Sequence, residues 1–200
     1  MSIYQFAPSP DIACREELIT TWENGFSEKQ LEDIISIGDE LVKMESTVSA
    51  SDGDSKQIEQ IRKSEVSWIA LNNRTEFIYN SMAYIARQLN GQFFNFDLYG
   101  FVEDFQYTVY RPEGDHYTWH IDKGRFNNAP RKLSMVLQLS DPSEYDGGDL
   151  EFFVSPSPTV AKKEKGLVYV FPSYLLHRVT PVTRGTRRTL VVWISGPKFR

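Results

Sequence analysis

The sequence contains little histidine and almost no cysteine. Three of its 200 residues are histidines and one, Cys14, is a cysteine. A single cysteine cannot close a disulfide within the chain, and such a composition is typical of a reducing compartment. We therefore expect a cytoplasmic protein in which Cys14 is an ordinary helix or loop residue.

Long hydrophobic runs and excess positive charge are also missing. No run of about 18 apolar residues occurs, which is the length that a membrane-spanning helix needs. The first residues lack a basic stretch followed by an apolar one, so we expect no signal peptide. A formal net charge of −5 argues against a basic face that binds a phosphate backbone. The sequence therefore predicts neither a membrane protein nor a nucleic-acid-binding protein, and it leaves the oligomeric state unknown.

Apolar and aromatic residues are plentiful enough for a core. They make up 40% and 14% of the chain, and 200 residues suit one domain, 1–200. Residues 45–60 are rich in Ser, Asp and Gly and lack a hydrophobic pattern, which predicts a mobile loop. We expect residues 1–60 to hold an N-terminal helix and this loop, and residues 61–200 to form the main body with a supporting helix.

Two segments have the hydrophobic periodicity of amphipathic helices, residues 27–44 and 74–91. Ser27 followed by Gln30 has the spacing of a capping box at the start of the first helix. The pair Asn90-Gly91 predicts a left-handed cap at the end of the second.

From residue 92 the pattern changes to short β-rich runs, beginning with "FFNFDLYGFVEDFQYTVYR" and separated by Gly, Pro, Asn and Asp. Two helices followed by many short strands indicate an α+β fold. We predict a double-stranded β-helix, or jelly-roll, core with buttressing N-terminal helices.

Two of the three histidines occur in "HYTWHID", residues 116–122. Side chains alternate along a strand, so His120 and Asp122 project to the same face and can bind one metal ion. His177 can supply a third ligand from a neighbouring strand. Two histidines and one carboxylate leave the opposite face of the metal open, as in non-heme Fe(II) oxygenases.

A third group lies ten residues beyond His177, in "RRT". Arg187 and Thr189 share one face of a strand, whereas Arg188 points to the other and is expected to be solvated. An arginine binds a carboxylate through two hydrogen bonds and stays ionised when buried. Together with the metal ligands, Arg187 indicates a cosubstrate with a distal carboxylate, such as 2-oxoglutarate.

These motifs resemble the Fe(II)/2-oxoglutarate-dependent dioxygenases, in the prolyl 4-hydroxylase-like branch, over residues 60–196. "YTWHID" resembles the proximal ligand motif, "YDGGDLEF" the Gly-Gly turn, and "VFPSYLLHRVTPVTRGTRRTL" the distal histidine and the cosubstrate arginine. "IRKSEVSWI", residues 61–69, resembles the start of the catalytic domain in the oxygen-sensing prolyl hydroxylases.

The resemblance implies Fe(II), 2-oxoglutarate and L-ascorbate as cofactors, with no catalytic side chain beyond the metal ligands. The implied residues are His120, Asp122 and His177 for the metal, Arg187, Thr189 and Tyr110 for the cosubstrate, and Trp193, Arg62 and Trp68 for the substrate pocket. His116 has no metal-binding role in this pattern. The family often has a second tyrosine on the strand after the proximal motif, but "KLSMVLQLS" has none. Whether Gln138 or Ser134 replaces it, or Arg187 and Thr189 act alone, stays open.

The expected reaction is hydroxylation of a proline in a protein or peptide, with release of succinate and carbon dioxide. Whether the loop at 45–60 closes over the substrate stays open. Three alternatives remain: the same chemistry on a free amino acid or another small molecule, a zinc hydrolase, and a binding jelly roll without turnover. A zinc hydrolase would lack a carboxylate base at a recognisable spacing and would leave Arg187 unexplained.

Overall fold

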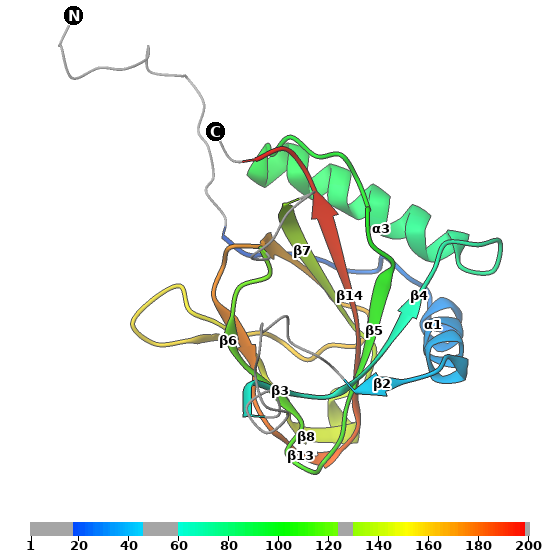
Figure 1. The fold of residues 1–200 in the computed structure, drawn as a ribbon, viewed down its shortest axis with the longest axis vertical. Coiled ribbons are helices and arrows are strands. Elements are labelled where there is room, and N and C mark those ends of the chain that lie inside the picture. The colour runs from blue at the N-terminus through cyan, green and yellow to red at the C-terminus, as the bar shows by residue number, and fades with distance from the viewer. Residues whose placement is uncertain (1–17, 46–59, 124–129, 199–200) are drawn as a thin grey trace, which may run out of the picture.

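The computed structural model describes residues 18–45, 60–123 and 130–198. Cys14 and residues 46–59, which include most of the predicted polar loop, lie outside the described residues. Figure 1 shows the helices α1 (Glu28–Glu40) and α3 (Glu76–Leu89) on the outside of a curved, two-sheet body. No helix in the described part of the chain has the length and hydrophobicity that crossing a lipid bilayer requires.

The described strands form three antiparallel sheets. The major sheet has the order β1 (Thr20–Trp22), β11 (Val168–Pro172), β7 (Arg131–Gln138), β14 (Arg187–Ser195), β5 (Phe105–Tyr110), β4 (Glu65–Ile69), β2 (Met44–Glu45). The minor sheet has the order β10 (Thr159–Val160), β9 (Leu150–Phe152), β12 (His177–Val179), β6 (His116–His120), β3 (Arg62–Lys63). A third sheet pairs β13 (Val182–Gly185) with β8 (Tyr145–Gly147).

Alternation along the major strands gives the major sheet two different buried faces. Its outer face packs on α1 and α3 through fully buried side chains such as Ile34, Met82 and Leu190. A Cβ atom on Gly38 of α1 would lie 2.5 Å from Cγ of Tyr107, so this glycine lets the helix approach the sheet closely. The larger core therefore lies between the helices and the major sheet.

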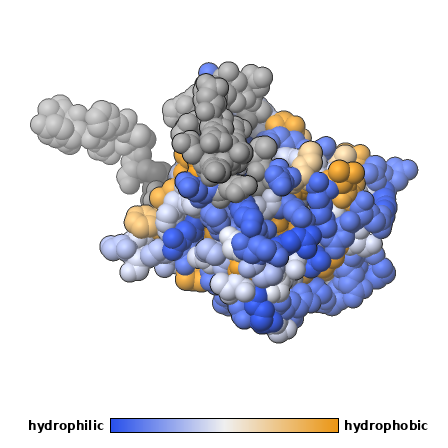
Figure 2. Space-filling model, turned by 60° about the horizontal axis from the view of Figure 1, so that its bottom comes forward, coloured by the Kyte–Doolittle hydropathy of each residue, from blue (hydrophilic) through white to orange (hydrophobic). Residues whose placement is uncertain are grey.

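The inner face of the major sheet packs against the minor sheet. Phe171 of β11 and Phe152 of β9 meet edge-on, with ring centroids 4.9 Å apart, in a second buried cluster that includes Val182. This is the predicted jelly-roll arrangement, in which two sheets enclose a space between them. The outer surface in the view of Figure 2 is largely hydrophilic, with hydrophobic side chains in small separate groups.

The first helix begins where the sequence predicts. Ser27 Oγ accepts a hydrogen bond from Gln30 N at 3.3 Å, and Gln30 Oε1 accepts one from Ser27 N at 2.9 Å, which completes the capping box. The helix ends at Glu40, four residues before the predicted end. Leu41 and Val42, expected on its apolar face, are instead exposed, and Val42 has 85% of its surface accessible.

The predicted cap at the end of α3 is wrong. Asn90 stays helical, and the chain continues as a short π-helix, η1 (Asn90–Phe94), before the left-handed residue Asn95, whose φ is 51°. The Asn90 side chain explains the wider turn because it donates to Phe96 O at 2.9 Å and accepts from Phe96 N at 3.0 Å.

The β-rich run expected from Phe93 onwards is also shorter than predicted, since β5 begins only at Phe105. The aromatic residues of this segment pack against the outer core from irregular backbone, among them Phe94, Phe96 and Phe101. Their β propensity therefore misled the prediction, because burial rather than sheet pairing selects them here.

Candidate active site

A cavity of about 350 Å³ lies between the major and minor sheets, and all nine candidate site residues line it. His120 comes from the end of β6, and His177 stands opposite it at the start of β12. Asp122 follows β6 by two residues, as the alternation argument requires. The sheet pairing thus brings together side chains that are 57 positions apart in the sequence.

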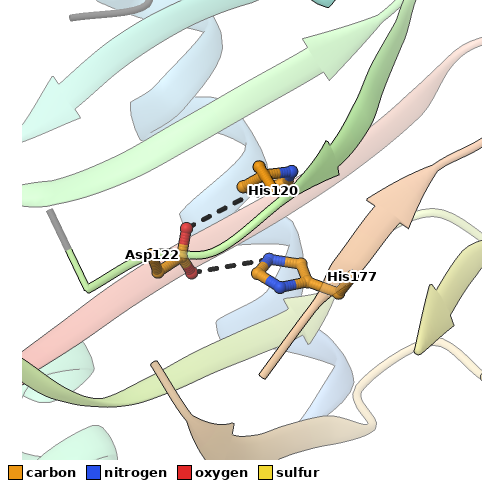
Figure 3. A group of neighbouring side chains, drawn as sticks. All are labelled: His120, Asp122 and His177. Atoms are coloured by element: carbon orange, nitrogen blue, oxygen red, sulfur yellow. Dashed lines mark ion pairs between the residues drawn. The ribbon is translucent and has the colours of Figure 1, made fainter. Parts of the chain in front are cut away.

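The three side chains form a compact cluster (Figure 3). Nε2 of His120 lies 3.5 Å from Oδ1 of Asp122, and Nε2 of His177 lies 3.5 Å from Oδ2 of the same carboxylate. The candidate ligand atoms are all within 4.8 Å of one another, which is close enough to bind a single metal ion.

Backbone contacts select the tautomer of both histidines. Nδ1 of His120 is 2.7 Å from Thr118 O, and Nδ1 of His177 is 2.8 Å from Leu175 O. A carbonyl oxygen only accepts hydrogen bonds, so we assign the proton to Nδ1 in each ring. Each Nε2 then presents a lone pair to the shared point, which is the state that a metal ligand needs.

The electrostatic environment favours an ionised Asp122 and a neutral His177. Burial acts to raise the pKa of Asp122, but the neighbouring His177 and His120 outweigh it and hold that pKa below its usual value. Burial lowers the pKa of His177, and Asp122 opposes this effect only in part. An ionised carboxylate beside a neutral imidazole suits a divalent cation.

Ser134 has a different place from the one considered in the sequence. Its hydroxyl donates to Oδ2 of Asp122 at 2.8 Å, while the backbone of Asp122 donates to Ser173 O at 2.8 Å. These contacts orient the carboxylate from behind. Ser134 therefore supports the metal-binding cluster and does not contact Arg187.

Arg187 lies deep in the cavity and is only 1% exposed. Its guanidinium donates to Gln138 Oε1 at 3.2 Å and lies 5.3 Å from the ring centre of Tyr110. Among the described residues, no acceptor satisfies its buried Nε and no carboxylate lies within salt-bridge distance. A buried cation without a counter-charge is costly, so this environment suits an anionic ligand such as a carboxylate.

The Gly-Gly turn makes room for this arginine. Gly148 has a φ of +60°, and a Cβ atom there would lie 2.9 Å from Cδ of Arg187 and 2.9 Å from Cγ2 of Val182. Thr189 lines the cavity two residues beyond Arg187, on the same face of β14. The Gly-Gly turn and Arg187 therefore belong to one packing arrangement.

Arg188 points away from the cavity as predicted, but it is not simply solvated. Its Nε lies 3.3 Å from Oδ2 of Asp39 in α1, so it helps to attach that helix to the major sheet. His116 also lies as predicted, outside the metal cluster. Its two ring nitrogens face Gly114 O at 2.8 Å and Gln60 O at 3.1 Å.

The lining of the cavity contains a pair that the sequence did not reveal. The guanidinium of Arg131 lies 3.5 Å from the ring centre of Trp193 and forms a two-pronged ion pair with Glu103. Trp68 approaches Trp193 from β4, with ring centroids 6.3 Å apart. The position of Arg131 at the first residue of a buried strand was the one available signal, because Glu103 lies in irregular backbone.

Residues 105–195 match the family model described as the 2OG-Fe(II) oxygenase superfamily. The resemblance to this superfamily is confirmed. A PKHD-type hydroxylase of Synechococcus sp. is 38% identical over 83 residues, covering 42% of this chain and 37% of that protein. Another PKHD-type hydroxylase, of Hyphomonas neptunium, is 42% identical over 88 residues, covering 42% and 39%. The matches thus span about two fifths of the length of these relatives.

Solved structures confirm the jelly-roll fold. The Trichoplax adhaerens prolyl hydroxylase in complex with a hypoxia inducible factor peptide fragment has a TM-score of 0.72 at 15% identity, covering 90% of this chain and 84% of that one. A Pseudomonas putida prolyl-4-hydroxylase has a TM-score of 0.66 at 21% identity, covering 90% and 93%. At these identities, the likeness establishes the fold alone.

Proposed function

We propose that this chain is an Fe(II)- and 2-oxoglutarate-dependent dioxygenase that hydroxylates a proline within a peptide. The observation that carries the proposal is the convergence of two different sites in one cavity. A cluster suited to a divalent cation, His120, Asp122 and His177, shares this cavity with the uncompensated guanidinium of Arg187. A zinc hydrolase would need only the metal-binding cluster, and a binding module would need neither site.

In this proposal the histidines bind Fe(II) through Nε2, and Asp122 binds it as a carboxylate. Ser134 holds Oδ2 of Asp122 in place, so the carboxylate loses little freedom when the ion binds. The residues present fit Fe(II), because two imidazoles and one carboxylate leave coordination positions free for other ligands.

Arg187 pairs with the distal carboxylate of 2-oxoglutarate, and Thr189 donates to the same group. Gln138 keeps the guanidinium directed into the cavity. Apolar side chains such as Val136, Val191 and Leu150 line part of the same cavity. When bound, Fe(II) and 2-oxoglutarate supply the oxidising chemistry, in which dioxygen, 2-oxoglutarate and a substrate C–H bond give succinate, carbon dioxide and a hydroxylated product.

The peptide substrate is supported by the lining of the cavity and by the relatives. Trp68, Trp193 and Arg131 present aromatic and hydrogen-bonding surface there, of a kind common in peptide-binding grooves. One structural neighbour is a prolyl hydroxylase described with a peptide fragment bound. We extend to this chain a peptidyl proline substrate, a cytoplasmic location and L-ascorbate as the reductant that keeps the iron ferrous.

Two measurements test the proposal. Anaerobic addition of Fe(II) and 2-oxoglutarate should give a visible charge-transfer band, which zinc would not give. A screen of proline-containing peptides by mass spectrometry should then find a gain of one oxygen atom, matched by one succinate per product. Absence of both the band and oxygen-dependent succinate release would contradict the assignment, while hydroxylation of free amino acids alone would replace the peptide substrate.

A further inference from the structure

Arg62 is a second buried arginine in the same cavity. It lies on β3, is only 8% exposed, and donates from Nε to Ser64 Oγ at 3.2 Å and from Nη2 to Gln106 Oε1 at 2.9 Å. A guanidinium has five N–H groups, and these contacts use two of them on neutral acceptors. Within the described residues Arg62 forms no ion pair with a carboxylate, so its positive charge is not neutralised by the protein there.

The position of Arg62 is close to the metal cluster. Its guanidinium carbon lies 4.7 Å from the ring centre of Tyr117, the residue opposite it in the pairing of β3 with β6. The ring of Tyr117 in turn stacks on that of His120, with centroids 3.4 Å apart and planes at 12°. A single aromatic ring thus separates Arg62 from a proposed iron ligand.

The charges that line the cavity balance except at Arg62. Arg131 is paired with Glu103. In the loaded site, the charges of Fe(II) and Arg187 are matched by Asp122 and the two carboxylates of 2-oxoglutarate. Tyr117 is a phenol, which is uncharged near pH 7, so it supplies no negative charge. One positive charge is then left over, next to the space that the substrate enters.

We propose that Arg62 binds a carboxylate group of the substrate. This inference rests on the proposed function and narrows its substrate class from any proline-containing peptide to one with an acidic residue near the target proline. A charge-assisted hydrogen bond in a cavity shielded from water gains more than one at an open surface, so the pair selects among peptides. The same chemistry is available from the α-carboxylate of a free amino acid, and the experiment separates these two sources.

The test compares two peptide series around one proline, with Glu or Gln scanned through the flanking positions. Binding is measured by calorimetry without oxygen, on protein loaded with Fe(II) and 2-oxoglutarate, and hydroxylation by mass spectrometry with oxygen. At one position or more, the wild-type protein should bind the Glu peptide at least about tenfold more tightly than its Gln partner. Arg62→Gln should remove this preference, and Arg62→Glu should reverse it in favour of a Lys peptide.

Arg184→Gln is the matched control. Arg184 of β13 pairs with Asp146 of β8, and 57% of its side chain is exposed. This variant loses the same charge as Arg62→Gln but should keep the Glu preference. A purely structural role for Arg62 predicts lower stability with an unchanged ratio of Glu to Gln affinities.

The outcomes separate the inference from the proposed function. Equal binding and hydroxylation of the Glu and Gln peptides by the wild-type protein would overturn the role of Arg62 and leave the proposed function intact. No charge-transfer band and no succinate would overturn the proposed function itself. Hydroxylation of free proline that depends on Arg62 would keep the carboxylate site and replace the peptide. The comparison of Glu and Gln peptides on the wild-type protein needs no substitution. A negative result there therefore cannot be attributed to a misfolded variant.

Discussion

Arg187 is buried and lacks a carboxylate partner among the described residues, so its positive charge is not neutralised by the protein. Replacing it with alanine should weaken 2-oxoglutarate binding by about 2–5 kcal/mol, the usual cost of losing one partner of a buried charged pair. Anaerobic calorimetry with 2-oxoglutarate measures this loss directly. Arg188→Ala serves as the control, because its side chain lies on the other face of β14 and should leave the affinity unchanged. Equal affinities of the two variants would count against the cosubstrate role of Arg187.

Gly148 offers a more subtle test of the same pocket. Gly148→Ala adds a Cβ atom 2.9 Å from Cδ of Arg187, so it should weaken 2-oxoglutarate binding as well as the fold. Gly166→Ala is a matched control, with a φ of +84° and a Cβ that meets only Leu31 of α1 at 3.2 Å. Both variants should lose about 1 kcal/mol or more of stability from the positive φ. A loss of affinity in both, or in neither, would show that Gly148 does not position the arginine.

The sequence predicted the residues of this site better than their neighbours. Strand alternation was enough to place His120 with Asp122 and Arg187 with Thr189. It could not place Ser134 behind Asp122 or Gln138 beside Arg187, because either side chain fits either role by type. Glu103 was missed for a different reason: it lies in irregular backbone, where no periodicity indicates the direction of a side chain.

Among the elements, the stability of α1 depends on a capping box that is predicted from the sequence. Ser27→Ala removes an acceptor for Gln30 N and should lower the free energy of unfolding by about 1 kcal/mol. Urea unfolding measures the difference. Ser36→Ala, in the middle of the same helix, should be close to neutral, since the higher helix propensity of alanine offsets the loss of the exposed hydrogen bond from Ser36 Oγ to Glu40 Oε1. A similar loss in both variants would point to a general effect of removing a hydroxyl.

The junction of α3 with β4 predicts a response to alkaline pH. Burial, with a contribution from the nearby Asp104, raises the pKa of Tyr79 to about 12, and its hydroxyl donates to Ile69 O at 2.9 Å. The unfolded chain would release this proton near pH 10, so the stabilisation is complete below that pH and is lost as the pH rises towards 12. Tyr79→Phe should therefore be less stable than the wild type at pH 8 and lose less stability between pH 10 and 12. Parallel curves would show that Tyr79 does not contribute.

Helix starts were predictable and helix ends were not. The capping box at Ser27 is a local signal, whereas the end of α3 depends on two hydrogen bonds between the Asn90 side chain and the backbone of Phe96, six residues away. Leu41 and Val42 continue the apolar spacing of α1 beyond its last turn, yet neither is buried. Local spacing therefore could not reveal where tertiary packing stops.

For the molecule as a whole, the metal cluster connects two strands that are distant in sequence. Divalent iron or manganese, added without oxygen, should raise the melting temperature of the wild-type protein, by the equivalent of about 2.7 kcal/mol at a hundredfold excess over the dissociation constant. A chelator should reverse the shift. His177→Ala should abolish it together with turnover, while His116→Ala should retain it, because both nitrogens of His116 already face carbonyl oxygens. An equal shift in His177→Ala would exclude this histidine as a ligand.

The jelly-roll class followed from many short strands after two helices, but the order of the strands did not. β14 lies between β7 and β5, and its register sets Arg187 opposite Tyr110. Such pairings join segments separated by tens of residues, and nothing in a local pattern selects one partner strand over another. The sheet order had to come from the structure.

One face of the major sheet packs against the helices and the other lines the cavity, and this division affects how such a protein can change during evolution. The side chains that dock α1 and α3 point outwards, while those that line the cavity point inwards from the same strands. Inward positions can therefore be exchanged with little disturbance to the helical side, so one scaffold can acquire new specificities by small steps. Because side chains alternate along every strand, the residues that stabilise the fold and the residues that can vary in specificity lie on opposite faces of the same sheet.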